Sequence, residues 1–175
     1  MRYASAALFV LLGLFAAAAS GQDVAPTAAL RLSDYSALTP TSIPGARVIE
    51  TSELRSLMQA PVERRPFLFD VRGERRESLP GAIWLPGAGR GTSFDDAIQP
   101  RLAAVLKETT QGDMARPIVF FCAGPRCWLS YNASLRAAKL GYTNVRWYRE
   151  GVEVWGEGGG ALTEPRVAWK PPPEK

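Results

Sequence analysis

Residues 118–128 read IVFFCAGPRCW, and this stretch decides the fold class. Its first four residues form a continuous apolar run, which is typical of a strand buried on both faces of a parallel sheet. A cysteine, a short loop containing glycine and proline, and a second cysteine come next, and a helix-forming sequence begins at Trp128. The stretch therefore predicts a buried strand, a tight loop and a helix in immediate succession.

The rest of the chain repeats this alternation of strand and helix. Thr51 or Ser52 can cap the first helix, and Gly141 gives a natural end to the helix that begins at Trp128. We therefore expect an α/β fold with a five-stranded, mainly parallel sheet. The predicted strands are 47–50, 67–71, 82–85, 117–121 and 144–148, and the predicted helices are 51–59, 95–109, 128–140 and 151–155.

The N-terminus has the pattern of a secretory signal peptide. Met1 and Arg2 precede an uncharged, mostly apolar run from Ala6 to Ala19, and small residues follow up to Gly21. The alternative is a membrane anchor, but a spanning helix needs about 20 apolar residues and this run is shorter. We predict that residues 1–21 are a cleaved signal peptide, and that the mature protein is periplasmic and free of the membrane.

The segments that flank the strand-and-helix region have a different composition. Residues 22–46 mix alanine, threonine, serine and proline with scattered apolar residues, and the sequence predicts an exposed lead-in there. Residues 159–175 are rich in glycine and proline and predict an irregular tail. The predicted domain thus spans residues 47–158.

Composition excludes several classes of function. The chain has no histidine, which removes the commonest general base and metal ligand, and its two cysteines cannot complete a four-ligand zinc site. The formal net charge of +4 falls to +3 once Arg2 is removed, and basic residues are scattered among acidic ones. We therefore expect no nucleic-acid partner, no metal and no bound cofactor.

The loop between the two cysteines has the features of an anion site. Backbone N–H groups that converge inside a tight turn, together with the start of a helix, favour a thiolate at the end of the preceding strand. Cys122 is therefore the candidate nucleophile, with the backbone from Ala123 to Trp128, including Gly124, as the cradle for substrate. The guanidinium of Arg126 can pair with the thiolate or with an anionic substrate.

Several segments in the same order along the chain resemble the rhodanese-like domains, whose sulfur-transfer loop starts with the catalytic cysteine and spans six residues. The resemblance implies helices on both faces of the sheet and a sulfurtransferase activity in which Cys122 accepts sulfur from a small sulfur-containing anion or thiol and carries it as a persulfide. The matching residues are the loop from Cys122 to Cys127, residues 69–72, Glu74, Glu77, and residues 79–83 and 141–145.

A narrower resemblance rests on residues 127–133 and on Trp147-Tyr148. These residues are similar to the PQQ-dependent catabolism-associated CXXCW-motif proteins, which are exported rhodanese-like proteins. That resemblance implies a role beside periplasmic alcohol oxidation, with a quinoprotein dehydrogenase or a cytochrome as the protein partner.

Two departures from the sulfurtransferase pattern lie in the cysteine loop. Cys127 occupies the last loop position, where it can resolve a persulfide on Cys122, release sulfide and leave a disulfide. Pro125 has no N–H to give to the cradle, and Gly124 lies one place earlier than the pattern has it. Because the protein is predicted to be exported, we expect the isolated protein to contain little free thiol.

Other interpretations of these residues remain open. The cysteine pair can be a structural disulfide, or the fold can be a non-catalytic module that docks a partner through the same crevice. Two thiolates can also hold a soft ion such as Cu(I) with help from a partner chain. Asp70 is expected to be structural, whereas Arg72 can attract an anionic sulfur donor and Trp128 can border the substrate site.

Overall fold

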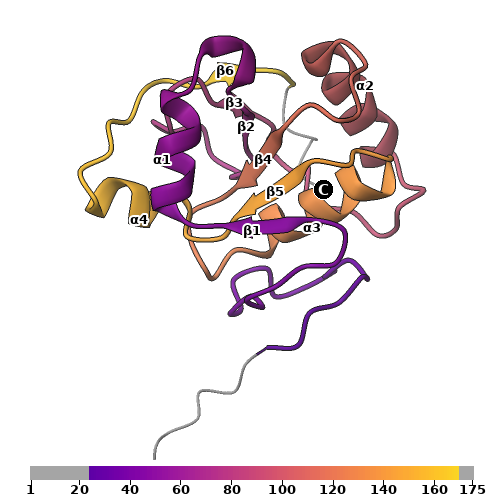
Figure 1. The fold of residues 1–175 in the computed structure, drawn as a ribbon. Coiled ribbons are helices and arrows are strands. Elements are labelled where there is room, and N and C mark those ends of the chain that lie inside the picture. Colours follow the sequence, from indigo (N-terminus) through magenta and orange to yellow (C-terminus); the bar gives the residue numbers. More distant parts are fainter. Residues whose placement is uncertain (1–23, 170–175) are drawn as a thin grey trace, which may run out of the picture.

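The computed structural model describes residues 24–169, so the predicted signal peptide lies outside the described residues. One layer of strands runs through the domain, with helices on either side of it (Figure 1). In chain order the elements are β1 (Arg47–Ile49), α1 (Thr51–Gln59), the 3-10 helix η1 (Val62–Arg64), β2 (Phe67–Asp70), β3 (Ile83–Trp84), α2 (Ile98–Thr110), β4 (Ile118–Phe121), α3 (Trp128–Lys139), β5 (Val145–Tyr148), α4 (Gly151–Glu157) and β6 (Arg166–Val167).

The strands form one six-stranded sheet in the order β1-β5-β4-β2-β3-β6, and every neighbouring pair is parallel. The α/β class and helices on both faces are confirmed, whereas the prediction of five strands is wrong by one. The additional strand, β6, lies at the edge beside β3, within the segment predicted to be an irregular tail. Because its two residues are both exposed and carry no apolar run, only backbone pairing with β3 could have identified it.

Alternating residues of β4 divide the core between the two faces. Ile118 and Phe120 pack with Leu102 of α2 and Ala133 of α3, and all four side chains are fully buried. On the opposite face, the side chains of Val119 and Phe121 pack against α1 and α4 through Leu54 and Trp155. Because successive side chains of a strand point to opposite faces of the sheet, one apolar run packs against the helices on both faces.

The first helix begins as predicted, but its cap comes from elsewhere in the chain. Neither Thr51 nor Ser52 caps α1, and the side chain of Glu50 makes no capping hydrogen bond. The Glu150 carboxylate instead accepts hydrogen bonds from the Thr51 backbone N–H at 2.7 Å and from its hydroxyl at 2.6 Å. A carboxylate from the loop after β5 therefore satisfies the start of α1, which sequence proximity could not reveal.

The lead-in segment packs closely on the domain and is not uniformly exposed. Ile43 is buried in a cluster with Trp128, Tyr131 and Trp147, in which the Trp128 and Tyr131 ring centroids are 4.8 Å apart. The Tyr131 hydroxyl donates to the Thr27 carbonyl and accepts from the Thr27 backbone N–H. The lead-in therefore covers the aromatic side of α3, where it lies in Figure 1.

No helix within residues 24–169 is long and apolar enough to cross a membrane.

A buried ion pair fixes the loop that precedes α2. The Arg136 guanidinium is fully buried and donates to the Asp96 carboxylate at 2.7 Å and to the Arg90 carbonyl at 2.7 Å. Partial burial opposes ionisation of Asp96, but hydrogen bonds from Arg136 and from the backbone N–H groups of Thr92 and Ser93 outweigh it and lower the Asp96 pKa to about 2. Arg136 and Asp96 together hold the backbone of residues 90–93, Arg136 through the Arg90 carbonyl and Asp96 through the Thr92 and Ser93 N–H groups.

We predict that the protein loses stability in acid as the Asp96 carboxylate becomes protonated. Because the Asp96 pKa is lowered from 3.8 to about 2, its stabilising contribution is fully present above about pH 4 and is lost as the pH falls toward about 2. Urea denaturation should show that Asp96→Asn removes about 1 to 2 kcal/mol of this pH-dependent stability. Asp95→Asn, at an exposed neighbouring position, is the matched control. An acid profile of Asp96→Asn equal to that of the wild type would contradict the assignment.

Candidate active site

The candidate site lies where the carboxyl ends of three neighbouring parallel strands meet. β4 leads into Cys122, while β2, on one side of β4, leads into Arg72. β5, on the other side, leads into Gly151 and α4. Because parallel strands present their carboxyl ends at one edge of a sheet, these three loops share a crevice.

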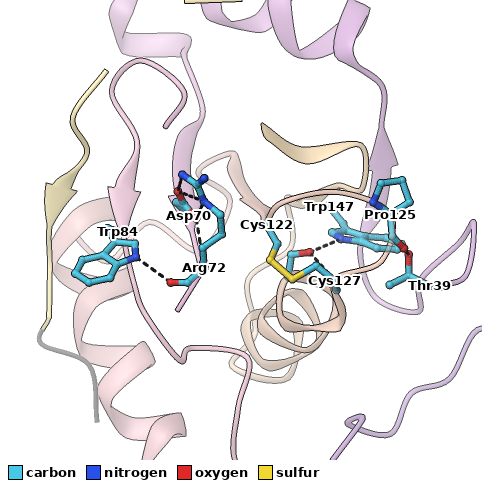
Figure 2. Close-up of a disulfide and its surroundings, with 9 residues drawn as sticks. Thr39, Asp70, Arg72, Trp84, Cys122, Pro125, Cys127 and Trp147 are labelled. Atoms are coloured by element: carbon cyan, nitrogen blue, oxygen red, sulfur yellow. Dashed lines mark hydrogen bonds and ion pairs between the residues drawn. A yellow bond between two sulfur atoms is a disulfide. The ribbon is translucent and has the colours of Figure 1, made fainter. Parts of the chain in front are cut away.

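Cys122 and Cys127 form a disulfide across the loop, with their Cα atoms 6.1 Å apart. This separation lies within the limit of about 7 Å for a disulfide that needs no backbone movement. Cys122 is 3% exposed, and the chain has no other cysteine. The expected disulfide is therefore present, and it lies between the Asp70–Arg72 pair and the contact of Thr39 with Pro125 (Figure 2).

The lead-in holds one side of the cysteine loop. The backbone N–H and the hydroxyl of Thr39 both donate to the Pro125 carbonyl, at 3.0 and 2.6 Å. The Trp128 N–H donates to the Tyr35 carbonyl at 2.9 Å, and its indole N–H donates to the Leu38 carbonyl at 3.2 Å. The centre and the end of the loop are thus tied to residues 35–39.

These contacts correct two expectations for the loop. The Trp128 N–H points to Tyr35, so it does not contribute to an anion cradle around Cys122. The Trp128 side chain, expected to border the substrate site, is 2% exposed, packs in the aromatic cluster and does not line the cleft beside the loop. Trp128, which follows Cys127 in the sequence, is therefore a core residue, because the helix start turns it away from the crevice.

The first turn of α4 holds the other side of the loop. The Val152 and Glu153 N–H groups donate to the Cys122 and Ala123 carbonyls at 3.0 and 2.9 Å. Gly151 makes this approach possible, since its φ is +67° and a Cβ there would lie 2.4 Å from the Ala123 oxygen. The loop is therefore clamped from both sides while its cysteines are joined.

The two arginines predicted for the site have different environments. Arg126 is exposed, and among the described residues its side chain has no hydrogen-bond or ion-pair partner. Arg72 is held in place: its guanidinium donates to the buried Asp70 carboxylate, with the shortest contact at 2.6 Å, and to the Glu77 carbonyl. Ser78 donates to the same carboxylate, so the expected structural role of Asp70 is confirmed.

A cleft of about 570 Å³ opens beside the cysteine loop. Such a volume lies in the range of pockets for organic ligands, and it exceeds what a single oxyanion needs. Ala123 brings the loop to the wall of the cleft, and charged side chains make up much of the rest. These are Arg72, Glu74, Arg76, Arg90 and Glu153.

A model of the rhodanese-like domain matches residues 50–157, which is more than half of the chain. The chain belongs to the rhodanese-like family. A comparison with curated proteins gave no match.

Solved structures share the fold of this rhodanese-like protein. A thiosulfate sulfurtransferase from Pseudomonas aeruginosa is 22% identical with a TM-score of 0.51, over 70% of this chain and 21% of its own. The BH2092 protein from Bacillus halodurans is 21% identical with a TM-score of 0.51, over 68% and 77% of the two chains. An anaerobic ergothioneine biosynthesis enzyme from Chlorobium limicola is 15% identical with a TM-score of 0.51, over 73% and 34%. This chain thus spans about a fifth of the Pseudomonas enzyme's length.

Sequence reasoning missed three residues of this rhodanese-like site. Glu153 was not among the predicted site residues, yet it lines the cleft and contacts the loop. Its position after β5, the strand next to β4, was a usable signal, because neighbouring parallel strands end at the same crevice. Thr39 and Arg90 lie in segments without apolar periodicity, and no pattern in the sequence indicates their contacts.

We predict that reducing the disulfide lowers the free energy of unfolding by about 2 kcal/mol, because the bond closes a loop with a sequence separation of 5. Urea titrations with and without a phosphine reductant measure the difference. The double variant Cys122→Ser with Cys127→Ser is the control, and its stability should not respond to reductant. Thiol labelling of both cysteines in the native protein before reduction would contradict the prediction.

Proposed function

We propose that this protein is a periplasmic sulfurtransferase with a redox-active cysteine pair, acting beside PQQ-dependent alcohol oxidation. The observation that carries the chemistry is the Cys122–Cys127 disulfide at the carboxyl edge of a rhodanese-like sheet, next to a cleft that holds three arginines. Residues 1–21 support export, and residues 127–133 with Trp147-Tyr148 support the association with quinoprotein dehydrogenases or cytochromes.

The reaction begins with the reduced pair. The Cys122 thiolate attacks the outer sulfur of a donor such as thiosulfate, forming a Cys122 persulfide and releasing sulfite. The Cys127 thiol then attacks the Cys122 sulfur, expels the outer sulfur as hydrosulfide and forms the disulfide. Two equivalents of an external thiol restore the dithiol and leave as their own disulfide. Arg72 and Arg90, on the cleft wall, supply positive charge toward an anionic donor.

A second candidate is a non-catalytic module that keeps the fold and docks a partner of the dehydrogenase system. The Trp128 N–H is used by Tyr35, and the Glu153 carboxylate lies over the loop, where it repels anions. Pro125 removes a further donor. These features favour docking because they weaken the loop as an anion site.

Sulfur transfer separates the two candidates. The reduced wild type should convert thiosulfate and cyanide to thiocyanate, and Cys122→Ala should fall to the background rate because it lacks the attacking sulfur. Cys127→Ser should hold one added sulfur in an intact-mass spectrum, since nothing resolves its persulfide. Turnover retained in Cys122→Ala would eliminate the assigned nucleophile. Absence of both turnover and adduct in the wild type would favour docking.

A further inference from the structure

Most charged side chains on the cleft wall form ion pairs with other side chains of the described residues, and one cation and one anion do not. Arg72 is held by Asp70, and Arg76 forms an ion pair with Glu74 at 2.5 Å. Glu153 remains, and within residues 24–169 no side chain donates a hydrogen bond to its carboxylate or forms an ion pair with it. The cleft therefore presents an unpaired carboxylate to a ligand.

Arg90 is the unpaired cation of the same cleft. Its guanidinium lies 5.5 Å from the centre of the Tyr35 ring and faces no carboxylate among the described residues. Its backbone is fixed by the hydrogen bond from the buried Arg136 to the Arg90 carbonyl. The guanidinium is thus anchored by an aromatic face while its N–H groups stay free to bind an anion.

The Glu153 carboxylate lies directly against the cysteine loop. A Cβ built on Gly124 would be 2.4 Å from a Glu153 carboxylate oxygen, so this oxygen occupies the space that a side chain at Gly124 would fill. The Glu153 backbone is fixed to the Ala123 carbonyl as well. A negative charge so placed opposes the approach of an anion to the cysteine pair and favours the approach of a cation.

We propose that the thiol which reopens the Cys122–Cys127 disulfide carries both an ammonium and a carboxylate group, as an amino-acid thiol does. Glu153 binds the ammonium, Arg90 binds the carboxylate, and the same Glu153 selects against small purely anionic thiols. The assignment rests on the proposed role of the cysteine pair, because it names the reductant of that pair. It explains why the cleft beside the cysteine loop keeps an unpaired carboxylate.

The chemical step is thiol–disulfide exchange. The thiolate of the first thiol attacks one sulfur of the protein disulfide, forming a mixed disulfide and releasing the other cysteine as a thiolate. A second thiolate attacks the sulfur of the bound thiol, so the two thiols leave as their own disulfide and the second cysteine is released as a thiolate. Two electrons pass from the two thiols to the protein, and no other oxidant or reductant takes part.

The test compares the reduction of the oxidised full chain by three thiols of different charge. These are cysteamine, which carries an ammonium, 2-mercaptoethanol, which is neutral, and 3-mercaptopropionate, which carries a carboxylate. Alkylation and intact mass count the free cysteines with time. The ratio of the variant rate to the wild-type rate for each thiol cancels the intrinsic reactivity of that thiol.

For Glu153→Gln we expect a rate about fivefold lower with cysteamine, about fivefold higher with 3-mercaptopropionate, and unchanged with 2-mercaptoethanol. Arg90→Gln should lower only the rate with 3-mercaptopropionate. Cysteine, which carries both groups, should react more slowly with either variant. Glu157→Gln is the matched control, because Glu157 is exposed on the same helix and does not line the cleft.

Equal changes with all three thiols, or none, would overturn the proposal. An equal change would mean that Glu153 acts on the loop's structure and not on the ligand's charge. The readout does not depend on sulfur transfer. If the protein forms no persulfide but the three thiols respond to the variants as expected, the proposed sulfur transfer is contradicted and the thiol specificity is supported. If the protein turns over thiosulfate but the three thiols do not respond as expected, the sulfur transfer is supported and the thiol specificity is contradicted.

Discussion

The site depends on one constraint: the loop between β4 and α3 is held by backbone hydrogen bonds from both sides. The lead-in binds the Pro125 carbonyl and the Trp128 N–H, and the first turn of α4 binds the Cys122 and Ala123 carbonyls. These contacts fix the two ends of the loop close enough for the disulfide. Three of these contacts occupy loop carbonyls, and only the Trp128 contact uses a loop N–H, so the clamp fixes the shape of the loop and withdraws one backbone donor from an anion site.

Charge pairing then decides which side chains remain available. Asp70 and Glu74 form ion pairs with Arg72 and Arg76, so two of the three cleft arginines already have an acidic partner. The Asp70 carboxylate is buried and needs its partner, since an uncompensated charge inside a protein is costly, whereas Arg76 and Glu74 pair at the exposed surface. Arg90 and Glu153 are the remaining cation and anion on the wall, and their opposite signs distinguish this cleft from one built only for oxyanions.

Much of the fold could be predicted from local patterns. The apolar run of β4 identified the central strand, and alternating strands and helices identified the α/β class. Gly141, with a φ of +97°, follows α3 where a glycine was expected to end the helix. The patterns failed for β6, the lead-in and the cap of α1. In each case the stabilising partner, such as Glu150 for Thr51, is distant in sequence.

The sequence by itself determined the element types, the position of the cysteine loop after a buried strand and the family to which the loop belongs. These follow from the period of apolar residues and from residue spacing, which are local properties of the chain. Only the tertiary structure decided that Trp128 faces the core, that Thr39 fastens the loop and that Glu153 lies over it. Those outcomes depend on which backbone groups meet across the fold, because hydrogen bonds and charges act between neighbours in space.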